Sequence, residues 1–319
     1  MENCSNGTSN CSHLGGGQGL DGPGFGVFSL LMALLSVALC ALTILTIAGL
    51  CTTQSMSKNL RIILINVLAG VLVMGGTYVM FTVLSVILVF ADTGLPPNLL
   101  CRFLTFTLSI GGFSRPLHVS AYAMAVLVIV RFGKKDWKML YSGLPIAFIW
   151  LLMLAMNTFA VIPSVTVLQY LDGVACFIDS DASFTEVGIV YSFFLIGFGS
   201  VCPMVASVVI PAYCLNYISR NSISGDTGYK KTISRLSLFL VTGNAVNLTG
   251  NLGITICAFT SYTSVSAYLL YGFGVLSLIP TPIFIIVFLK AVQDQVKKII
   301  TCHRNENRIY PFTASEKMN

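Results

Sequence analysis

Arg115 is the residue of this chain whose position most needs a chemical explanation. It lies in a long apolar stretch, fourteen residues after Cys101, which is about 21 Å along an α-helix. If that stretch spans a membrane, the arginine costs about 2.5–3.5 kcal/mol on insertion scales and needs acceptors for its N–H groups. No Asp or Glu lies at a matching depth, so amides are the expected partners. Three of them share one helical face: Asn244, Asn247 and Asn251.

Two hypotheses for Arg115 remain open at this point. In the first, neighbouring Asn side chains and water satisfy the guanidinium, which then acts as a structural tie. In the second, the charge takes part in gating or in anion binding. His118 lies one helical turn further on, and we expect it to form a hydrogen bond inside the protein rather than to contact a ligand or to sense pH. Arg115, His118 and the three Asn residues form a predicted intramembrane polar network.

The remaining reactive side chains form no catalytic or metal-binding pattern. The sequence has no Ser/His/Asp set at one depth, no phosphate-binding glycine loop and no pair of carboxylates inside an apolar stretch. Its Cys and His residues are not spaced as metal ligands are. We therefore expect no enzyme activity, no metal and no cofactor.

The elements that must position these residues are membrane helices. Hydrophobic residues make up 55% of the 319 residues and charged residues only 9%, whereas a soluble domain carries about 25% charged residues. Continuous apolar runs of about 20 residues or more are long enough to cross a bilayer as helices, and they lack the alternation of barrel strands. Seven such runs are present, at about 27–52, 61–90, 101–131, 139–162, 186–217, 232–258 and 267–289.

The predicted fold is therefore all-α, a seven-transmembrane helix bundle with a short amphipathic eighth helix. The predicted domains are an extracellular glycosylated tail at 1–26, the bundle at 27–290, and an amphipathic helix with a cytoplasmic tail at 291–319. Lys and Arg accumulate on the cytoplasmic side of membrane proteins. With the N-terminus outside and the C-terminus in the cytoplasm, sixteen of the 18 Lys and Arg residues lie on the cytoplasmic side.

The outer segments carry their own signals. Residues 1–26 contain no Lys or Arg but three glycosylation sequons, at Asn3, Asn6 and Asn10. Cys101 and Cys176 both face the oxidising side, where a disulfide would pin the second outer loop over the bundle. Whether Cys4 and Cys11 pair, and whether Cys302 is palmitoylated, stays open. The basic inner face is expected to lie against anionic lipid of the bilayer, and binding of nucleic acid is not indicated.

The layout resembles the rhodopsin-like G protein-coupled receptor family over nearly the whole chain. Several residues stand where that family keeps its motifs, and the run from Phe288 to Thr301 is similar to the family's amphipathic helix along the inner leaflet. The matching residues are the Cys101–Cys176 pair, Asn66 of the second span, Trp150 and Pro163 of the fourth, Pro203 of the fifth, and Thr281-Pro282 of the seventh. The resemblance implies a receptor in the plasma membrane with a heterotrimeric G protein as its partner, through the basic second and third inner loops.

The short motifs of the family's activation switch are altered. Ala125-Val126-Leu127 replaces Asp-Arg-Tyr, Val71 replaces the Asp of the second span, and Ile285 replaces a Tyr after Pro282. Residues 232–266 contain neither Trp nor Pro. The chain resembles a chemosensory, olfactory-type member. It does not resemble an opsin, which has a Lys in the seventh span, nor an amine receptor, which has an Asp where Leu108 stands.

Two expectations about sites follow from the resemblance. Where relatives hold a sodium ion near the Asp of the second span, the guanidinium of Arg115 is expected to fill the space. The outer half of the bundle is expected to hold a small, mostly apolar ligand. Its predicted lining comes from the third, fifth and seventh spans: Thr105, Leu108, Ser109, Gly112, Tyr191, Phe194, Tyr268 and Tyr271.

Two other functions remain as alternatives to the receptor. A small transporter or channel would need a continuous polar path or ionisable groups at the midplane of the membrane, for which Arg115 is the only support. A seven-helix protein that does not signal, such as a decoy receptor, would tolerate the altered motifs.

The distribution of basic residues predicts the orientation of the chain in the membrane. We expect an epitope tag at residue 2 to be stained on intact cells, and a tag at residue 319 to be stained only after permeabilisation. Immunofluorescence of the two tagged chains measures this directly. Staining in the reverse pattern would show that the orientation is wrong.

Overall fold

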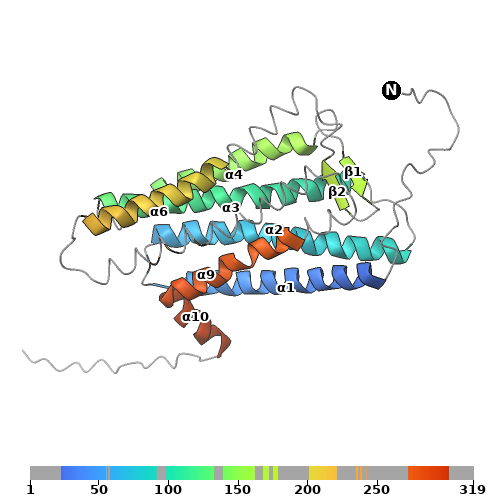
Figure 1. Cartoon of the computed structure of the whole chain (residues 1–319), viewed down its shortest axis with the longest axis horizontal. Helices are drawn as coiled ribbons and strands as arrows, with labels where there is room; N and C mark the ends of the chain where they lie inside the picture. Colours follow the sequence, from blue (N-terminus) through green and yellow to red (C-terminus); the bar gives the residue numbers. More distant parts are fainter. Residues whose placement is uncertain are drawn as a thin grey trace, which may run out of the picture.

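The structure is a computed structural model, and it describes only part of the chain. The described residues are 23–54, 56, 58–91, 98–132, 139–161, 168–171, 175–178, 201–220, 235, 238, 242 and 272–301. Their helices are α1 (Pro23–Thr52), α2 (Lys58–Ala91), α3 (Asn98–Phe132), α4 (Met139–Val161), α6 (Cys202–Arg220), α9 (Pro280–Phe288) and α10 (Lys290–Ile300). Figure 1 shows α1, α2, α3, α4 and α6 running side by side.

The described helices are those of a membrane-embedded protein. Three are long and apolar enough to cross a bilayer: Leu30–Thr52, Lys58–Leu84 and Cys202–Arg220. A fourth candidate is the bent pair Gly272–Phe288 and Lys290–Ile300, while α4 contributes a shorter apolar helix, Gly143–Thr158. α3 is also long, at 35 residues, but Arg115 and His118 lower the hydropathy of its middle. The described part of the chain therefore supplies three or four candidate spans, and most of the predicted sixth span lies outside it.

The predicted second outer loop contains a short β-hairpin, which the all-α expectation did not include. Strands β1 (Leu168–Leu171) and β2 (Ala175–Ile178) are antiparallel, with Tyr170 opposite Cys176. A connection that covers the end of a bundle has backbone N–H and C=O groups to satisfy, and pairing with itself satisfies them. β2 also contacts α3, so the hairpin lies against the central helix.

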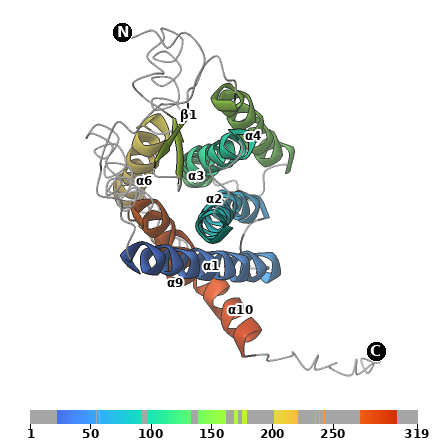
Figure 2. The ribbon, with the colours of Figure 1, turned by 90° about the vertical axis from the view of Figure 1, so that its right-hand side faces the viewer.

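α3 occupies the centre of the described bundle. It contacts α2, α4, α6 and β2, and the turned view in Figure 2 shows it between these helices. α1 packs on α2, and α9 contacts both α1 and α2. α3 therefore contacts four of the other described elements, and this is the helix that carries Arg115 and His118.

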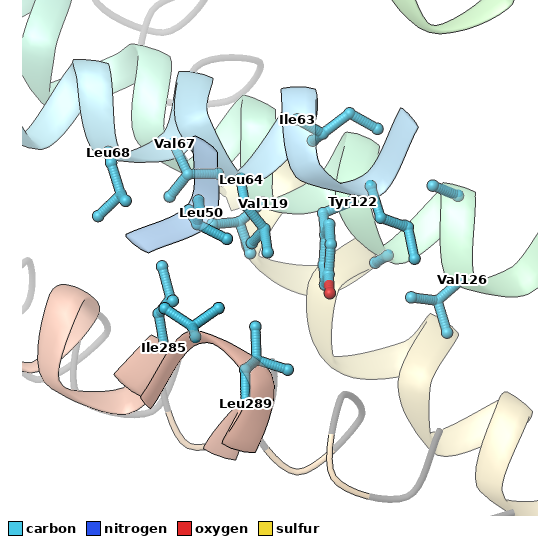
Figure 3. Packing of buried hydrophobic residues seen from close by; sticks show 14 of the residues in the cluster. Leu50, Ile63, Leu64, Val67, Leu68, Val119, Tyr122, Val126, Ile285 and Leu289 are labelled. Carbon is cyan, nitrogen blue, oxygen red and sulfur yellow. The ribbon is translucent and has the colours of Figure 1, made fainter. Parts of the chain in front are cut away.

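Apolar side chains fill the half of the bundle that contains the end of α3 and that the sequence predicts to be the inner, cytoplasmic half (Figure 3). Leu64 and Leu68 of α2 face Ile285 of α9 in this cluster, and Tyr122 and Val126 of α3 complete it. Val126 is 1% exposed and Ile285 is fully buried. Both stand where the family resemblance places polar residues of the activation switch. At these positions the protein has a packed apolar core, held by van der Waals contact rather than by hydrogen bonds.

Two glycines let α2 and α3 approach closely. A Cβ atom at Gly111 would lie 2.8 Å from Cβ of Met74 and 2.9 Å from its backbone nitrogen. A Cβ atom at Gly70 would lie 2.6 Å from the hydroxyl oxygen of Ser114. Close approach through small residues is a common way for membrane helices to gain packing energy, because lipid offers no hydrophobic drive for association. A hydrogen bond between the hydroxyl groups of Thr77 and Thr107, 3.2 Å long, lies further along the same contact.

The amphipathic run at the end of the bundle forms α10. The chain bends by 100° between Gly272–Phe288 and Lys290–Ile300, at Leu289, which leaves helical geometry with φ −105° and ψ 87°. Val292 and Val296 are buried, and they lie against Gly49 near the end of α1. Because α10 turns away from the axis of the preceding helix and is charged on its other face, the bent pair is better understood as a span followed by a surface helix than as one span.

The close contact of α2 and α3 predicts that two adjacent glycines respond differently to substitution. Gly111→Ala would force its methyl group onto the backbone of Met74, so we expect it to lower the free energy of unfolding by about 1–3 kcal/mol. Gly112→Ala is the matched control, because its Cβ would meet only Cε of Met74, at 4.0 Å. Thermal unfolding of the detergent-purified variants measures both, and equal melting temperatures would contradict the packing argument.

Candidate intramembrane polar site

Arg115 lies inside the bundle and reaches another helix. Its side chain is 5% exposed, and its Nη1 donates a hydrogen bond to the carbonyl oxygen of Ser277 at 3.2 Å. Ser277 belongs to the helical segment Gly272–Phe288, and its hydroxyl group donates to the carbonyl of Gly274 at 2.8 Å. The guanidinium therefore links α3 to the predicted seventh span. Its position inside the protein agrees with the cost of leaving such a charge in lipid.

Tyr78 of α2 reaches the same region. A Cβ atom at Gly274 would lie 2.0 Å from the hydroxyl oxygen of Tyr78, so the end of the tyrosine side chain lies directly against the Cα of Gly274. Glycine is the residue that leaves room for this contact. α2, α3 and the segment Gly272–Phe288 thus meet around Arg115, Tyr78 and Ser277, which we call the Arg115 junction.

The surroundings of the Arg115 junction are apolar. Val71 is fully buried and packs with Met74 and Tyr78 of α2 and with Val275 and Leu278 of the segment Gly272–Phe288. Val71 stands where the family resemblance places an Asp, so in the described residues this position carries packing and no charge. The fixed cation of Arg115, one helix away, is the charged group of the region.

The predicted Asn partners of Arg115 cannot be placed. Asn244, Asn247 and Asn251 lie outside the described residues, so their contact with Arg115 stays a prediction. The partner that sequence reasoning missed is a backbone carbonyl, which has no side-chain signature. The one available signal is depth, because Ser277 in the seventh apolar run is predicted at the same depth in the membrane as Arg115.

His118 forms the interior hydrogen bond that its position predicts. It is fully buried, and its Nδ1 lies 2.7 Å from the carbonyl oxygen of Ser114. A carbonyl only accepts, so Nδ1 carries the hydrogen, and Nε2 of the neutral ring is an acceptor. Nε2 has no partner among the described residues. The ring packs on Trp150 of α4, with centroids 5.2 Å apart and planes at 48°.

Trp150, which packs on His118 of α3, also forms a hydrogen bond with α2. Its indole Nε1 donates to Oδ1 of Asn66 at 2.9 Å, and Nδ2 of Asn66 donates to the carbonyl of Ile62 at 2.9 Å. The sequence singled out Asn66 and Trp150 separately, on different apolar runs, and the structure brings them together. With His118 they join α2, α3 and α4 in the middle of the bundle.

The predicted ligand lining is described only on α3. Thr105 is buried, Ser109 is half-buried, and Leu108 packs in two apolar clusters that include residues of α2. Gly112 lies near Met74 of α2. Leu108 and Gly112 therefore face α2. The other predicted lining residues lie outside the described part of the chain: Tyr191, Phe194, Tyr268 and Tyr271.

The outer disulfide and the sequons are only partly within the described residues. Cys101 lies in the first turns of α3, and Cys176 lies in β2, which contacts α3. Their side chains are not described, so the bridge stays a prediction. Asn3, Asn6 and Asn10 lie outside the described residues. Where side chains are described, no group of three His, Cys, Asp or Glu residues could hold a metal ion.

Comparison with known proteins assigns no family to the chain. No protein-family model matches it, and no curated protein matches it either. A functional interpretation therefore depends on the residues and contacts described above.

The energetics of Arg115 predict the effect of removing its charge. A charge-assisted hydrogen bond contributes about 1.5–3 kcal/mol, whereas an arginine at this depth costs about 2.5–3.5 kcal/mol. Because the interactions of Arg115 and the cost of its burial oppose each other, we expect Arg115→Met to change the melting temperature only slightly and to alter activity instead. Arg115→Lys should restore activity only in part, because Lys lacks the planar fork of donors.

Thermal unfolding in detergent and an activity assay on the same preparations separate the two hypotheses for Arg115. A melting temperature of Arg115→Met well below that of the wild type would favour the structural tie. Wild-type activity in Arg115→Met would contradict a role in gating.

Proposed function

We propose that the chain is a seven-helix receptor of the rhodopsin-like kind in the plasma membrane, with its N-terminus outside. The observation that carries this proposal is the hydrogen bond between Trp150 and Asn66. Asn66 and Trp150 each resemble a family position, and they lie in different apolar runs. Because these two residues also contact each other, together they support the proposal more strongly than either residue does alone.

The arrangement of the described elements supports the same proposal. α3 is central, β2 with Cys176 lies against the helix that carries Cys101, and α10 leaves the last span at 100°. In the proposed receptor, the disulfide Cys101–Cys176 holds the hairpin over the ligand site, and Asn3, Asn6 and Asn10 carry glycans. The ligand is small and mostly apolar, and it binds in the outer half of the bundle.

A heterotrimeric G protein is the proposed cytoplasmic partner. The basic second and third inner loops supply the charge that would meet it. The apolar core around Val126 and Ile285 means that signalling cannot use the polar switch of the family at those positions. In the proposed receptor, the signal would instead be transmitted by movement of the inner ends of the helices relative to each other.

A non-signalling seven-helix protein, such as a decoy receptor, is the second candidate. The same apolar core favours it, because a packed inner half resists opening. A transporter is less well supported by the described residues, since Arg115 and His118 are enclosed in the bundle rather than exposed along a path.

A nucleotide-exchange assay tests the proposed function. Membranes that contain the chain and purified G proteins are exposed to a panel of small apolar ligands, and we expect at least one ligand to accelerate GTP binding. The control variant replaces Lys134, Lys135 and Lys138 of the second inner loop by Gln. It should bind the ligand as the wild type does, but lose at least about tenfold in exchange rate, which corresponds to about 1.4 kcal/mol.

The alternatives give different results in the same membranes. Ligand binding without exchange under any condition would support the decoy. Uptake of the ligand into sealed vesicles would support the transporter, and either result would contradict the proposed receptor.

A further inference from the structure

The inner ends of α3 and α6 are joined by a cation–π contact. Arg131 lies in the last turn of α3, and its Cζ is 5.2 Å from the centre of the Tyr217 ring on α6. A guanidinium within about 6 Å of an aromatic centroid is attracted by the negative face of the ring. The resemblance would place an arginine at Val126. The chain instead has one five residues later, at Arg131, and its partner is on a different helix.

The aromatic partner is held in place from its own helix. Tyr213 lies one turn before Tyr217, and the two rings stack with centroids 6.2 Å apart and planes at 25°. Tyr217 also packs on the inner apolar cluster, to which α6 contributes the buried Cys214 and Ile218. The ring is therefore fixed on one side by stacking and on another by the core, while Arg131 approaches from α3.

The pair marks the boundary between the packed core and the cytoplasmic end. Val126 and Val130 of α3 are buried in the same apolar cluster, whereas Arg131 is exposed and α3 ends one residue later. α6 ends three residues after Tyr217, at Arg220. Among the described residues, the contact therefore lies within one turn of the end of both helices.

We propose that Arg131, Tyr217 and Tyr213 form a latch that holds the inner end of α6 against α3 and opens when the two helices separate. A cation–π contact at an exposed site changes an equilibrium by only about two- to fivefold. A contact of that strength biases the position of a helix end without locking it. The consequence for signalling depends on the proposed function, but the latch itself does not.

Amide hydrogen exchange tests the latch without a ligand or a partner. The chain is placed in lipid nanodiscs, and exchange is followed by mass spectrometry in peptides that cover 213–220, with peptides of α2 as the reference for an intact fold. Local opening of a helix end exposes its amides. We expect Arg131→Gln and Tyr217→Leu each to accelerate exchange at 213–220 by about two- to fivefold, with α2 unchanged.

Three control variants show that the cation and the ring are responsible. Arg131→Lys keeps a cation and Tyr217→Phe keeps the ring, so both should stay close to the wild-type rate. Arg220→Gln removes the same charge from the same end of α6 without touching the contact, and it should also leave the rate unchanged. The double variant Arg131→Gln with Tyr217→Leu should not exceed Tyr217→Leu alone, because the leucine already removes the contact that Arg131 makes.

Several results would overturn the latch. They are a wild-type rate in Arg131→Gln, an equal rate in Arg131→Gln and Arg220→Gln, or additive effects in the double variant. Basal GTP exchange measured on the same variants separates the latch from the receptor function. Faster amide exchange at 213–220 with no G protein activity in any variant would leave the latch standing and contradict the receptor.

Discussion

The absence of water in the bilayer core is the constraint on which the rest of this structure depends. Backbone groups are satisfied inside helices, but the polar side chains of those helices must find partners in the protein. Hydroxyl groups meet the requirement locally: Thr43 donates to the carbonyl of Leu39, and Ser207 donates to that of Met204. Arg115 and Trp150 instead bond to groups on other helices, the carbonyl of Ser277 and the side chain of Asn66. They must reach across, and so they determine which helices lie together.

The close contact between α2 and α3 makes these longer links possible. Because Gly70 and Gly111 have no side chains, the two backbones approach until Met74 and Ser114 touch the opposite helix. On one side of this contact Tyr78 and Arg115 reach the segment Gly272–Phe288, and on the other Asn66 meets Trp150 of α4. A wider separation of α2 and α3 would move both sets of contacts apart.

The sequence predicts these helices well because their signal is long and redundant. Twenty or more apolar residues identify a span even when some residues are polar, and the spacing of Val292 and Val296 identifies the buried face of α10. The burial of Arg115 and His118 was also predictable, because exposing such polar side chains to lipid costs so much free energy.

The carbonyl of Ser277 could not be predicted as the partner of Arg115, since every residue has a carbonyl. The β-hairpin was missed because its two strands have four residues each and lie in a loop with no clear alternation. The pairing of Asn66 with Trp150 requires the relative depth of two helices, which one sequence does not supply.

The position of Pro116 connects the two ends of α3. Proline has no N–H group, so the helix loses one backbone hydrogen bond at Pro116, within its 35 residues. On the outer side of this point Arg115 ties α3 to the segment Gly272–Phe288, and on the inner side Arg131 ties it to α6. A helix bends most easily where its hydrogen bonding is already interrupted. Arg115 is adjacent to that point, so a bend of α3 there would move the Arg115 junction relative to the inner half of the helix. Over the fifteen residues from Pro116 to Arg131, about 22 Å of helix, a small change of angle becomes a larger displacement at the inner end. The cation–π contact to Tyr217 is weaker than the packing of the apolar core around Tyr122, so such a displacement meets less resistance at the contact than within the core.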